Sequence, residues 1–222
     1  MALSPPGLSQ IQLDFLTCWF EQTSDFFLTG GAALVVACEV PRITKDLDLF
    51  TASTEALQHV EKLVEHVARA IGADSTSLRT APYFRRYKVS RFSATTLVDL
   101  VADPVSPIYP SKLKRGTFIV DPPEEILVNK ICAIVGRGEG RDFVDAYFLS
   151  SLGFDIEVAL LAANQKDGGV DASSLLYVLS DIDWSRFQVP DIEPELVRAT
   201  ATFFDNWAES MARRLFPEPE GR

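Results

Sequence analysis

The sequence predicts an α+β protein, in which a core built on a mixed sheet is followed by a helical domain. Two observations support this class. Short apolar strands alternate with amphipathic helices up to about Asp121, whereas the later apolar patterns have helical spacing. The chain is also long and apolar enough to bury a core, with 222 residues of which 47% are hydrophobic. We therefore predict a core domain at 1–121, a helical domain at 122–216 and a disordered tail at 217–222.

The first elements of the core alternate between helix and strand. A helix at 9–22 carries apolar residues at three- and four-residue spacing, and a short apolar strand at 26–28 follows it. Small apolar residues at 32–38 predict a helix that packs closely on a sheet. Along residues 46–50, acidic side chains alternate with leucines with period two, which is typical of a strand. Residues 54–71 keep the spacing of one amphipathic helix.

The rest of the core is expected to be β structure, and the remainder of the chain to be helical. Two strands, at 86–92 and 95–102, are joined by a tight turn, and a further strand occupies 116–120. The helices of the second domain are predicted at 124–135, 141–152, 156–164, 172–179 and 195–216.

The overall charge limits what the protein binds. A formal net charge of −10 and a pI of about 4.7 count against a general DNA-binding module. They do not count against an enzyme that touches one RNA end through a local basic patch or a bound metal. The three cysteines form no CxxC pair, as is typical of reduced core cysteines. With no signal peptide and no apolar run of about 20 residues, we expect a cytoplasmic protein without a membrane partner.

The strongest chemical signal is the pair Asp46 and Asp48. Alternation along a strand directs both carboxylates to the same face, where they repel each other. A divalent cation removes that penalty, and Mg²⁺ favours one or two carboxylates together with substrate phosphate oxygens. The competing interpretation is a solvated face of an edge strand.

A glycine pair, Gly30-Gly31, precedes the acidic pair in the sequence. Glycine permits a positive φ and lets a phosphate approach the backbone, and the helix that follows directs its N–H groups at that anion. A glycine turn for a triphosphate and two acids for a metal are the two parts that metal-assisted nucleotidyl transfer needs. We therefore predict a nucleoside triphosphate and Mg²⁺ as ligands.

Asp99 interrupts an otherwise apolar strand, where an unpaired acid is costly. It is predicted to join the metal site, as a ligand or as the base for the acceptor hydroxyl. The alternative is a buried acid paired with Arg86 or Lys88 on the adjacent strand.

A second block follows near the start of the helical domain. Lys130 and Arg137 are spaced to share one helical face, and Arg141, Asp142 and Asp145 open the next helix. Cations in this block are predicted to bind the terminal phosphates. In the alternatives, Lys130 only extends to solvent and Arg141 pairs with Asp145.

An aromatic and basic run lies between the two blocks. Arg85 and Arg86 stand beside Tyr83, Phe84 and Tyr87, as in a small RNA-stacking patch. An ordinary entry from loop to strand explains the same residues.

The two blocks together resemble the AbiEii/AbiGii-type nucleotidyltransferase toxins of the polymerase-β-like superfamily. The match consists of GG-x-A-L and R-x-[ST]-x-DLDLF, and then of K-x-x-A-x-x-x-R and RD-x-x-D. With this resemblance, the predicted catalytic residues are Asp46, Asp48, Asp99 and Lys130, of which the three acids are also the predicted metal ligands. The predicted nucleotide-binding residues are Gly30, Gly31, Thr44, Lys130, Arg137, Asp142 and Asp145.

The resemblance implies transfer of a nucleotide to RNA, often a tRNA acceptor end, by the toxin of a toxin–antitoxin pair. An antitoxin protein is then an expected partner. Two alternatives stay open within the same fold. One is a transferase for a small cationic molecule such as an aminoglycoside, and the other is a catalytically silent binding module.

Overall fold

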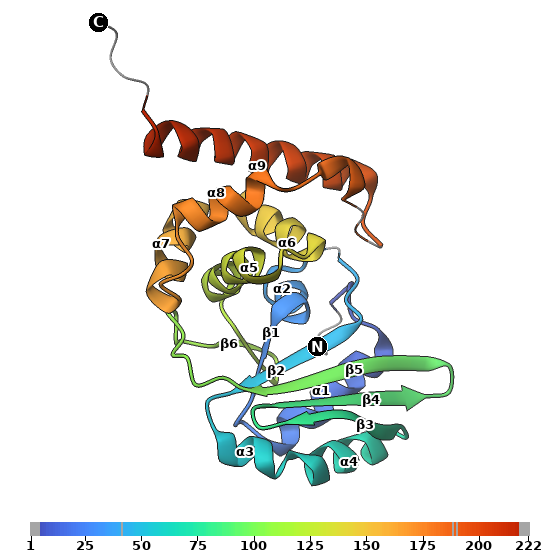
Figure 1. Ribbon diagram of the computed structural model, residues 1–222. Coiled ribbons are helices and arrows are strands. Elements are labelled where there is room, and N and C mark those ends of the chain that lie inside the picture. The colour runs from blue at the N-terminus through green and yellow to red at the C-terminus, as the bar shows by residue number, and fades with distance from the viewer. Residues whose placement is uncertain (1–4, 41, 188, 190, 218–222) are drawn as a thin grey trace, which may run out of the picture. The chain divides into compact units, whose positions relative to one another are not determined.

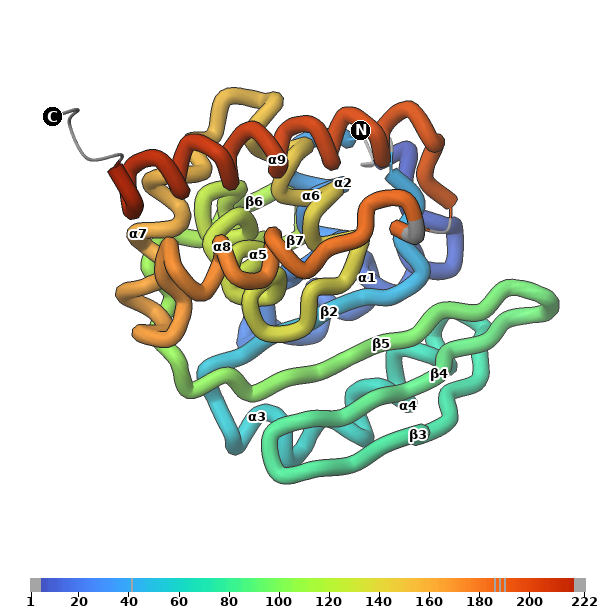
Figure 2. The backbone as a smooth tube through the Cα atoms, turned by 45° about the horizontal axis from the view of Figure 1, so that its top comes forward, coloured from blue at the N-terminus to red at the C-terminus, as the bar shows by residue number. Residues whose placement is uncertain are grey.

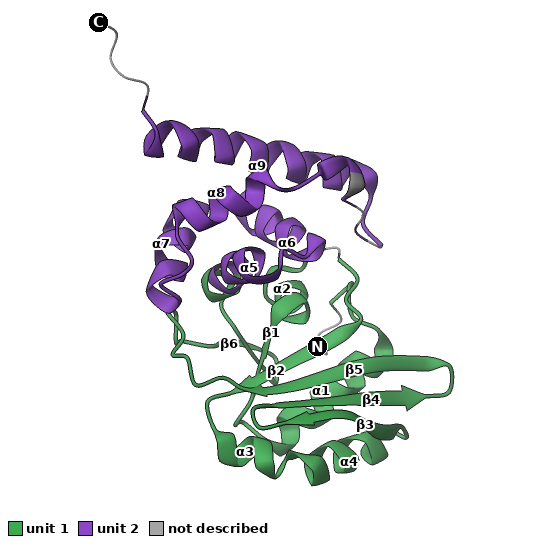
Figure 3. Cartoon of the chain, viewed as in Figure 1, with its two compact units in different colours: residues 1–126 green, residues 127–222 purple. Residues whose placement is uncertain are grey.

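The computed structural model describes residues 5–40, 42–187, 189 and 191–217. It divides into two compact units, Met1–Ile126 and Leu127–Arg222 (Figure 3). In the described residues the first unit combines a mixed sheet with helices and the second is helical, which confirms the predicted fold class. The predicted domain limits stay a prediction, and the predicted tail lies outside the described residues beyond position 217.

The described part of the first unit contains a seven-stranded sheet with the order β3-β4-β5-β2-β1-β7-β6 (Figure 1). The strands are β1 (Phe27–Thr29), β2 (Asp46–Thr51), β3 (Asp74–Ala81), β4 (Phe84–Arg91), β5 (Ala94–Ala102), β6 (Leu113–Arg115) and β7 (Phe118–Val120). The helices are α1 (Gln10–Gln22), α2 (Gly30–Cys38), α3 (Thr54–Gln58) and α4 (Val60–Ala70). Two strand pairs, β2 with β5 and β1 with β7, are parallel, and the other neighbours are antiparallel, so the sheet is mixed.

Apolar side chains pack helices against one side of this sheet. Phe15 and Trp19 of α1 stack at 5.6 Å, and Trp19 meets Phe26 edge-on at 5.2 Å. Alternate residues of β4, Tyr87 and Val89, are buried on the same side. Figures 1 and 2 show α1, α3 and α4 gathered along that side of β3, β4 and β5. The opposite side of these strands carries the acidic and basic residues described below.

Three local expectations were wrong. Strand β3 was not predicted, because its eight residues are mostly exposed Ser, Thr and charged side chains without an apolar face. Strand β6 lies just before the strand expected at 116–120 and was not predicted, because two of its three residues are exposed basic side chains. The helix expected at 54–71 is two helices, since the backbone leaves helical geometry at His59 with φ −99° and ψ 5°.

The described part of the second unit is built from helices around an aromatic cluster. The elements are the continuation of α5 (Pro123–Arg137), then α6 (Gly140–Ser151), α7 (Ile156–Lys166), α8 (Ala172–Ser180), the 3₁₀ turn η1 (Trp184–Arg186) and α9 (Pro194–Leu215). Phe143 is fully buried and meets Trp184, Phe187 and Phe204 at centroid distances of 5.5, 5.5 and 5.1 Å. Edge-to-face aromatic pairs of this kind stabilise a small helical core. None of the helices described, in either unit, has both the length and the apolar character needed to cross a membrane.

Candidate active site

A row of polar residues crosses the first unit's sheet. In the strand registers, Arg86 lies opposite Asp99, Asp99 opposite Asp48, and Asp48 opposite Thr29. Directly opposed residues project from the same face of a sheet. Asp46, two positions before Asp48, shares this face as well. The acidic pair is half-buried while the intervening Leu47 is fully buried, so the predicted alternation is observed.

The glycine bend and the acidic pair meet in space. Gly30 begins α2 with φ +64°, and a β-carbon placed on it would overlap the Asp48 carboxylate oxygen Oδ2 and come within 3.1 Å of Asp48 Cγ. The carboxylate therefore lies directly against the backbone of the bend. Since only glycine lacks the side-chain atom that would overlap this carboxylate, and adopts this φ without strain, glycine is favoured at position 30 for both reasons.

A cation also reaches the bend. A β-carbon on Gly31 would overlap the Arg42 guanidinium, whose Cζ would lie 3.0 Å away. Arg42 is 5% exposed, so its charge is held inside the protein next to the first turn of α2. Thr44 is buried and its hydroxyl donates to the backbone oxygen of Asp46 at 3.2 Å. Its observed contact fixes the start of β2, and its predicted contact with nucleotide stays a prediction.

Asp99 pairs with Arg86, which is one of the two partners that the alternative interpretation named. Arg86 donates from Nε to Asp99 Oδ1 at 2.7 Å and from Nη2 to Oδ2 at 2.5 Å. This hydrogen-bonded pair is the first cause that raises the pKa of Arg86, and the charges of Asp46 and Asp48 add to it. Each Asp99 oxygen accepts one hydrogen bond from Arg86, and each keeps a second lone pair. Its role as third ligand or base stays a prediction.

A buried ion pair that was not predicted from the sequence lies at the other end of the row. Asp121 follows β7 directly and is 1% exposed, and Lys112 Nζ lies 2.5 Å from its Oδ1. Burial raises the pKa of Asp121, although hydrogen bonds from Lys112 and Thr29 oppose that shift. Lys112 also lies over the ring of Phe27 at 3.6 Å. An acid placed directly after an apolar strand was the available signal, and it resembled an ordinary turn.

The acidic pair fits a metal that arrives with a substrate. In the stretches of chain that the structure describes, no group of three His, Cys, Asp or Glu side chains converges as a resident metal centre requires. Mg²⁺ needs only one or two carboxylates when phosphate oxygens and water complete its octahedral shell. Asp46 and Asp48, on one face of the sheet and with Asp48 against the glycine bend, supply that number.

Replacing Gly30 with alanine is expected to impair the site more than the fold. The left-handed backbone costs about 1–2 kcal/mol for alanine, and the added methyl displaces the Asp48 carboxylate. A displacement of about 1 Å is expected to lower the predicted nucleotide transfer roughly 100-fold. The matched control is Gly72→Ala, because Gly72 has φ +68° and nothing within 4 Å of an added β-carbon. Equal transfer by the two variants, measured at equal folded fraction, contradicts the contact between bend and acid.

The second block forms a buried ion network in the second unit. Lys130, 8% exposed, lies 2.9 Å from Asp142 Oδ1 and 2.7 Å from Asp145 Oδ2. Arg137, on the same helix as Lys130, donates from Nε to Asp142 Oδ2 at 2.9 Å and from Nη2 to Asp142 Oδ1 at 3.1 Å. Burial alone would lower the pKa of Lys130, but the charges of Asp145 and Asp142 outweigh it and raise the pKa. The lysine is therefore held as a cation inside the unit.

Two alternatives for this block were wrong. Lys130 does not extend to solvent, since its ammonium is buried between two carboxylates. Arg141 does not pair with Asp145, because its guanidinium lies 3.7 Å from Asp191 while Asp145 is engaged by Lys130. The predicted part of this network in nucleotide binding stays a prediction.

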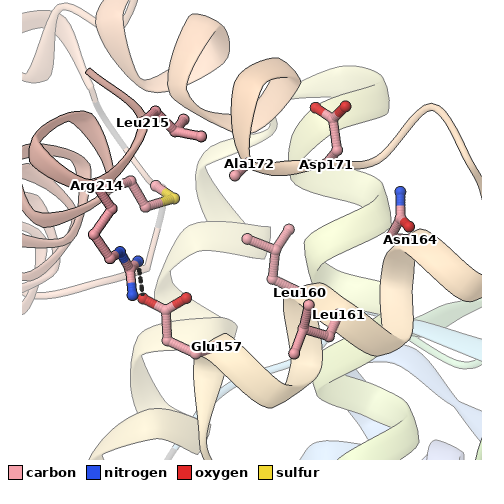
Figure 4. A pocket seen from close by; sticks show the side chains of 9 residues that line it. Glu157, Leu160, Leu161, Asn164, Asp171, Ala172, Arg214 and Leu215 are labelled. Carbon is pink, nitrogen blue, oxygen red and sulfur yellow. Dashed lines mark hydrogen bonds and ion pairs between the residues drawn. The ribbon is translucent and has the colours of Figure 1, made fainter. Parts of the chain in front are cut away.

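A separate pocket of about 440 Å³ lies within the second unit (Figure 4). Leu160, Leu161 and Met211 supply apolar walls, and Glu157 and Arg214 form an ion pair of 2.5 Å at its side. Its lining residues belong to neither of the sequence blocks, so this pocket is not the predicted nucleotide site.

Comparisons with known proteins agree with this architecture. The family model described as "Nucleotidyl transferase AbiEii toxin, Type IV TA system" matches residues 14–220. Among solved structures, JHP933 from Helicobacter pylori is similar at 18% identity and a TM-score of 0.57, covering 93% of this chain and 94% of that one. A candidate nucleotidyltransferase from H. pylori is similar at 18% identity and a TM-score of 0.56, covering 96% and 100%. No curated protein matches the sequence.

At this identity the two structures establish the fold alone, whereas the family model spans almost the whole sequence. The chain belongs to the AbiEii family of nucleotidyl transferase toxins of type IV toxin–antitoxin systems.

Proposed function

We propose that this protein transfers a nucleotide from a Mg²⁺-bound nucleoside triphosphate to a hydroxyl of RNA, at a tRNA end, and releases pyrophosphate. The observation that carries the proposal is the contact between the Asp48 carboxylate and the backbone of Gly30. A site for metal and a site for phosphate thereby coincide at the first turn of a helix. An antitoxin encoded by the same system is the expected regulator.

Each residue of the first unit's site has a task in this proposal. Asp46 and Asp48 hold the metal, which would neutralise phosphate charge and favour attack at the α-phosphate. Gly30 and Gly31 place no side chain of their own between the first turn of α2 and the phosphates, and the charge of Arg42, buried against Gly31, would add attraction there. Charges that the folded protein already keeps in position do not have to reorganise when charge develops in the transition state.

Two cations of the second unit, Lys130 and Arg137, are proposed to bind phosphate. Lys130 is a cation whose charge is maintained by two carboxylates, and Arg137 is 56% exposed at its side chain. Arg137 therefore offers N–H groups to solvent while it also contacts Asp142. Its exposure makes it a better candidate for direct phosphate contact than Lys130.

The position of a radioactive label distinguishes the proposal from its alternatives. Triphosphates labelled at the α-phosphate are incubated with the protein, Mg²⁺ and either total tRNA or an aminoglycoside. Label on RNA from the α-position, and none from the γ-position, is the expected result. Label on the small molecule supports the alternative acceptor. No labelled acceptor, together with no Mg²⁺-dependent nucleotide binding, supports the silent binding module and contradicts the proposal.

A further inference from the structure

The sheet extends past the acidic pair into an open basic surface, here called the basic face, made of Arg79 on β3 and of Phe84, Arg86 and Lys88 on β4. The register places Arg86 opposite Asp99, and Asp99 lies opposite Asp48, so the basic face begins two strands from the acidic pair. Two strand spacings amount to about 10 Å. The surface and the proposed active site therefore share one side of one sheet.

The charge of this segment opposes that of the rest of the chain. Residues 74–91 contain five basic residues and one acidic residue, in a protein of net charge −10. Two of the five turn away from the basic face: Arg85 donates to the backbone oxygens of Ala81 and Phe84, and Arg91 pairs with Asp14 at 2.6 Å. The others remain on it, and Arg79 and Lys88 are exposed.

An aromatic ring is centred among these cations. Phe84 is half-buried, with the guanidinium carbons of Arg79 and Arg86 at 5.5 and 5.6 Å from its centroid. Tyr87, named in the sequence analysis as part of the aromatic run, is 4% exposed on the opposite side of the sheet and does not contribute. A half-buried ring with two guanidinium groups beside it presents stacking and charge together.

We infer that the basic face binds the single-stranded end of the RNA acceptor and leads it to the acidic pair. This inference rests on the proposed function and names the surface that recognises its substrate. Unpaired bases stack on aromatic rings and guanidinium planes, whereas bases inside a duplex are not available for it. Arg, Lys, Ser and Thr are the side chains that contact phosphates, and exposed Thr76 lies opposite Lys88 on this face.

Binding of a short fluorescent single-stranded RNA tests this inference without requiring transfer. The double variant Arg79→Glu/Lys88→Glu is expected to bind about tenfold or more weakly and to show a shallower salt dependence, because two phosphate contacts are lost. Phe84→Leu keeps an apolar side chain but removes the ring, and it is expected to weaken binding about fivefold or more.

The matched control reverses two charges on the helical side of the sheet. Lys62 and Arg69 are exposed on α4, so Lys62→Glu/Arg69→Glu changes the net charge equally and leaves the basic face intact. This control is expected to bind RNA nearly as the natural protein does. Equal weakening by both double variants, or equal competition by duplex RNA of the same length, overturns the inference.

Nucleotide binding separates this inference from the proposed function. Binding of the Mg²⁺-bound triphosphate, measured by calorimetry, is expected to be the same in all these variants. If the natural protein binds no triphosphate, the proposed function fails. If all variants bind triphosphate and RNA as the natural protein does, only the basic face is refuted.

Discussion

Asp48→Asn is expected to abolish nucleotide transfer while leaving the fold intact. Asparagine keeps the size of the side chain beside Gly30 but removes the charge that binds the metal. Loss of a preorganised charge at a reacting centre costs a factor of about 10³ in rate. Since asparagine is nearly isosteric with the half-buried aspartate, the fold should stay intact.

Transfer of α-labelled nucleotide and thermal unfolding, measured on the same preparation, check this prediction. Asp25→Asn is the matched control, since Asp25 is an exposed acid just before β1 and the chemical change is identical. Full activity in Asp48→Asn removes that carboxylate from the mechanism. Equal losses in both variants attribute the effect to net charge instead.

Lys130→Met is expected to cause the largest loss of stability. Methionine fills much of the same space but removes the ammonium that contacts the buried carboxylates of both Asp142 and Asp145, and Arg137 then remains as a cation beside Asp142. Removing one partner of a buried ion network costs about 3–5 kcal/mol in the free energy of unfolding. The triple variant Lys130→Met/Asp142→Asn/Asp145→Asn should recover part of it. A triple variant no more stable than the single variant means that packing, rather than charge, holds the helices together.

The pH dependence of unfolding gives an independent check on Lys130. Its raised pKa means that the network stabilises the protein fully at neutral pH and weakens only as pH rises past about 10. The pKa of Asp142 is lowered, because Lys130 and Arg137 outweigh the effect of burial, so that contribution is lost only as pH falls below about 4. In Lys130→Met, Asp142 loses one of the two cations that lower its pKa and should bind a proton more readily. Lowering the pH from neutral is therefore expected to narrow the stability difference from the natural protein, as followed by chemical denaturation.

The parts of the fold that could be predicted are those with a strong apolar period. Strand β2 alternates between Asp and Leu, so its buried and exposed sides follow from the sequence. Strand β3 could not be found in this way, because a mostly exposed edge strand is stabilised by backbone pairing with β4 and needs no apolar face. The break at His59 was also hidden, since α3 and α4 continue one apolar pattern.

The candidate site shows a similar division. Neighbours in sequence, such as Asp46 with Asp48 and Gly30 with Gly31, could be placed from local rules. Partners chosen by tertiary structure could not be fixed: Asp99 had two possible partners, and strand register selects Arg86. The alternative pairing of Arg141 with Asp145 was wrong for the same reason. Helical spacing permits that contact, but in the folded unit the Arg141 guanidinium lies near Asp191 instead.

The central claim is that the glycine bend and the acidic pair form one site for metal and triphosphate. Calorimetric titration of a non-hydrolysable triphosphate, with Mg²⁺ and then with a chelator, tests it most directly on the natural protein and on Asp46→Asn/Asp48→Asn. The account predicts that Mg²⁺ strengthens binding to the natural protein and that this increment disappears in the double variant. In the chelator, the variant should bind at least as well as the natural protein, because two negative charges no longer repel the phosphates. An undiminished Mg²⁺ increment in the double variant would contradict the account.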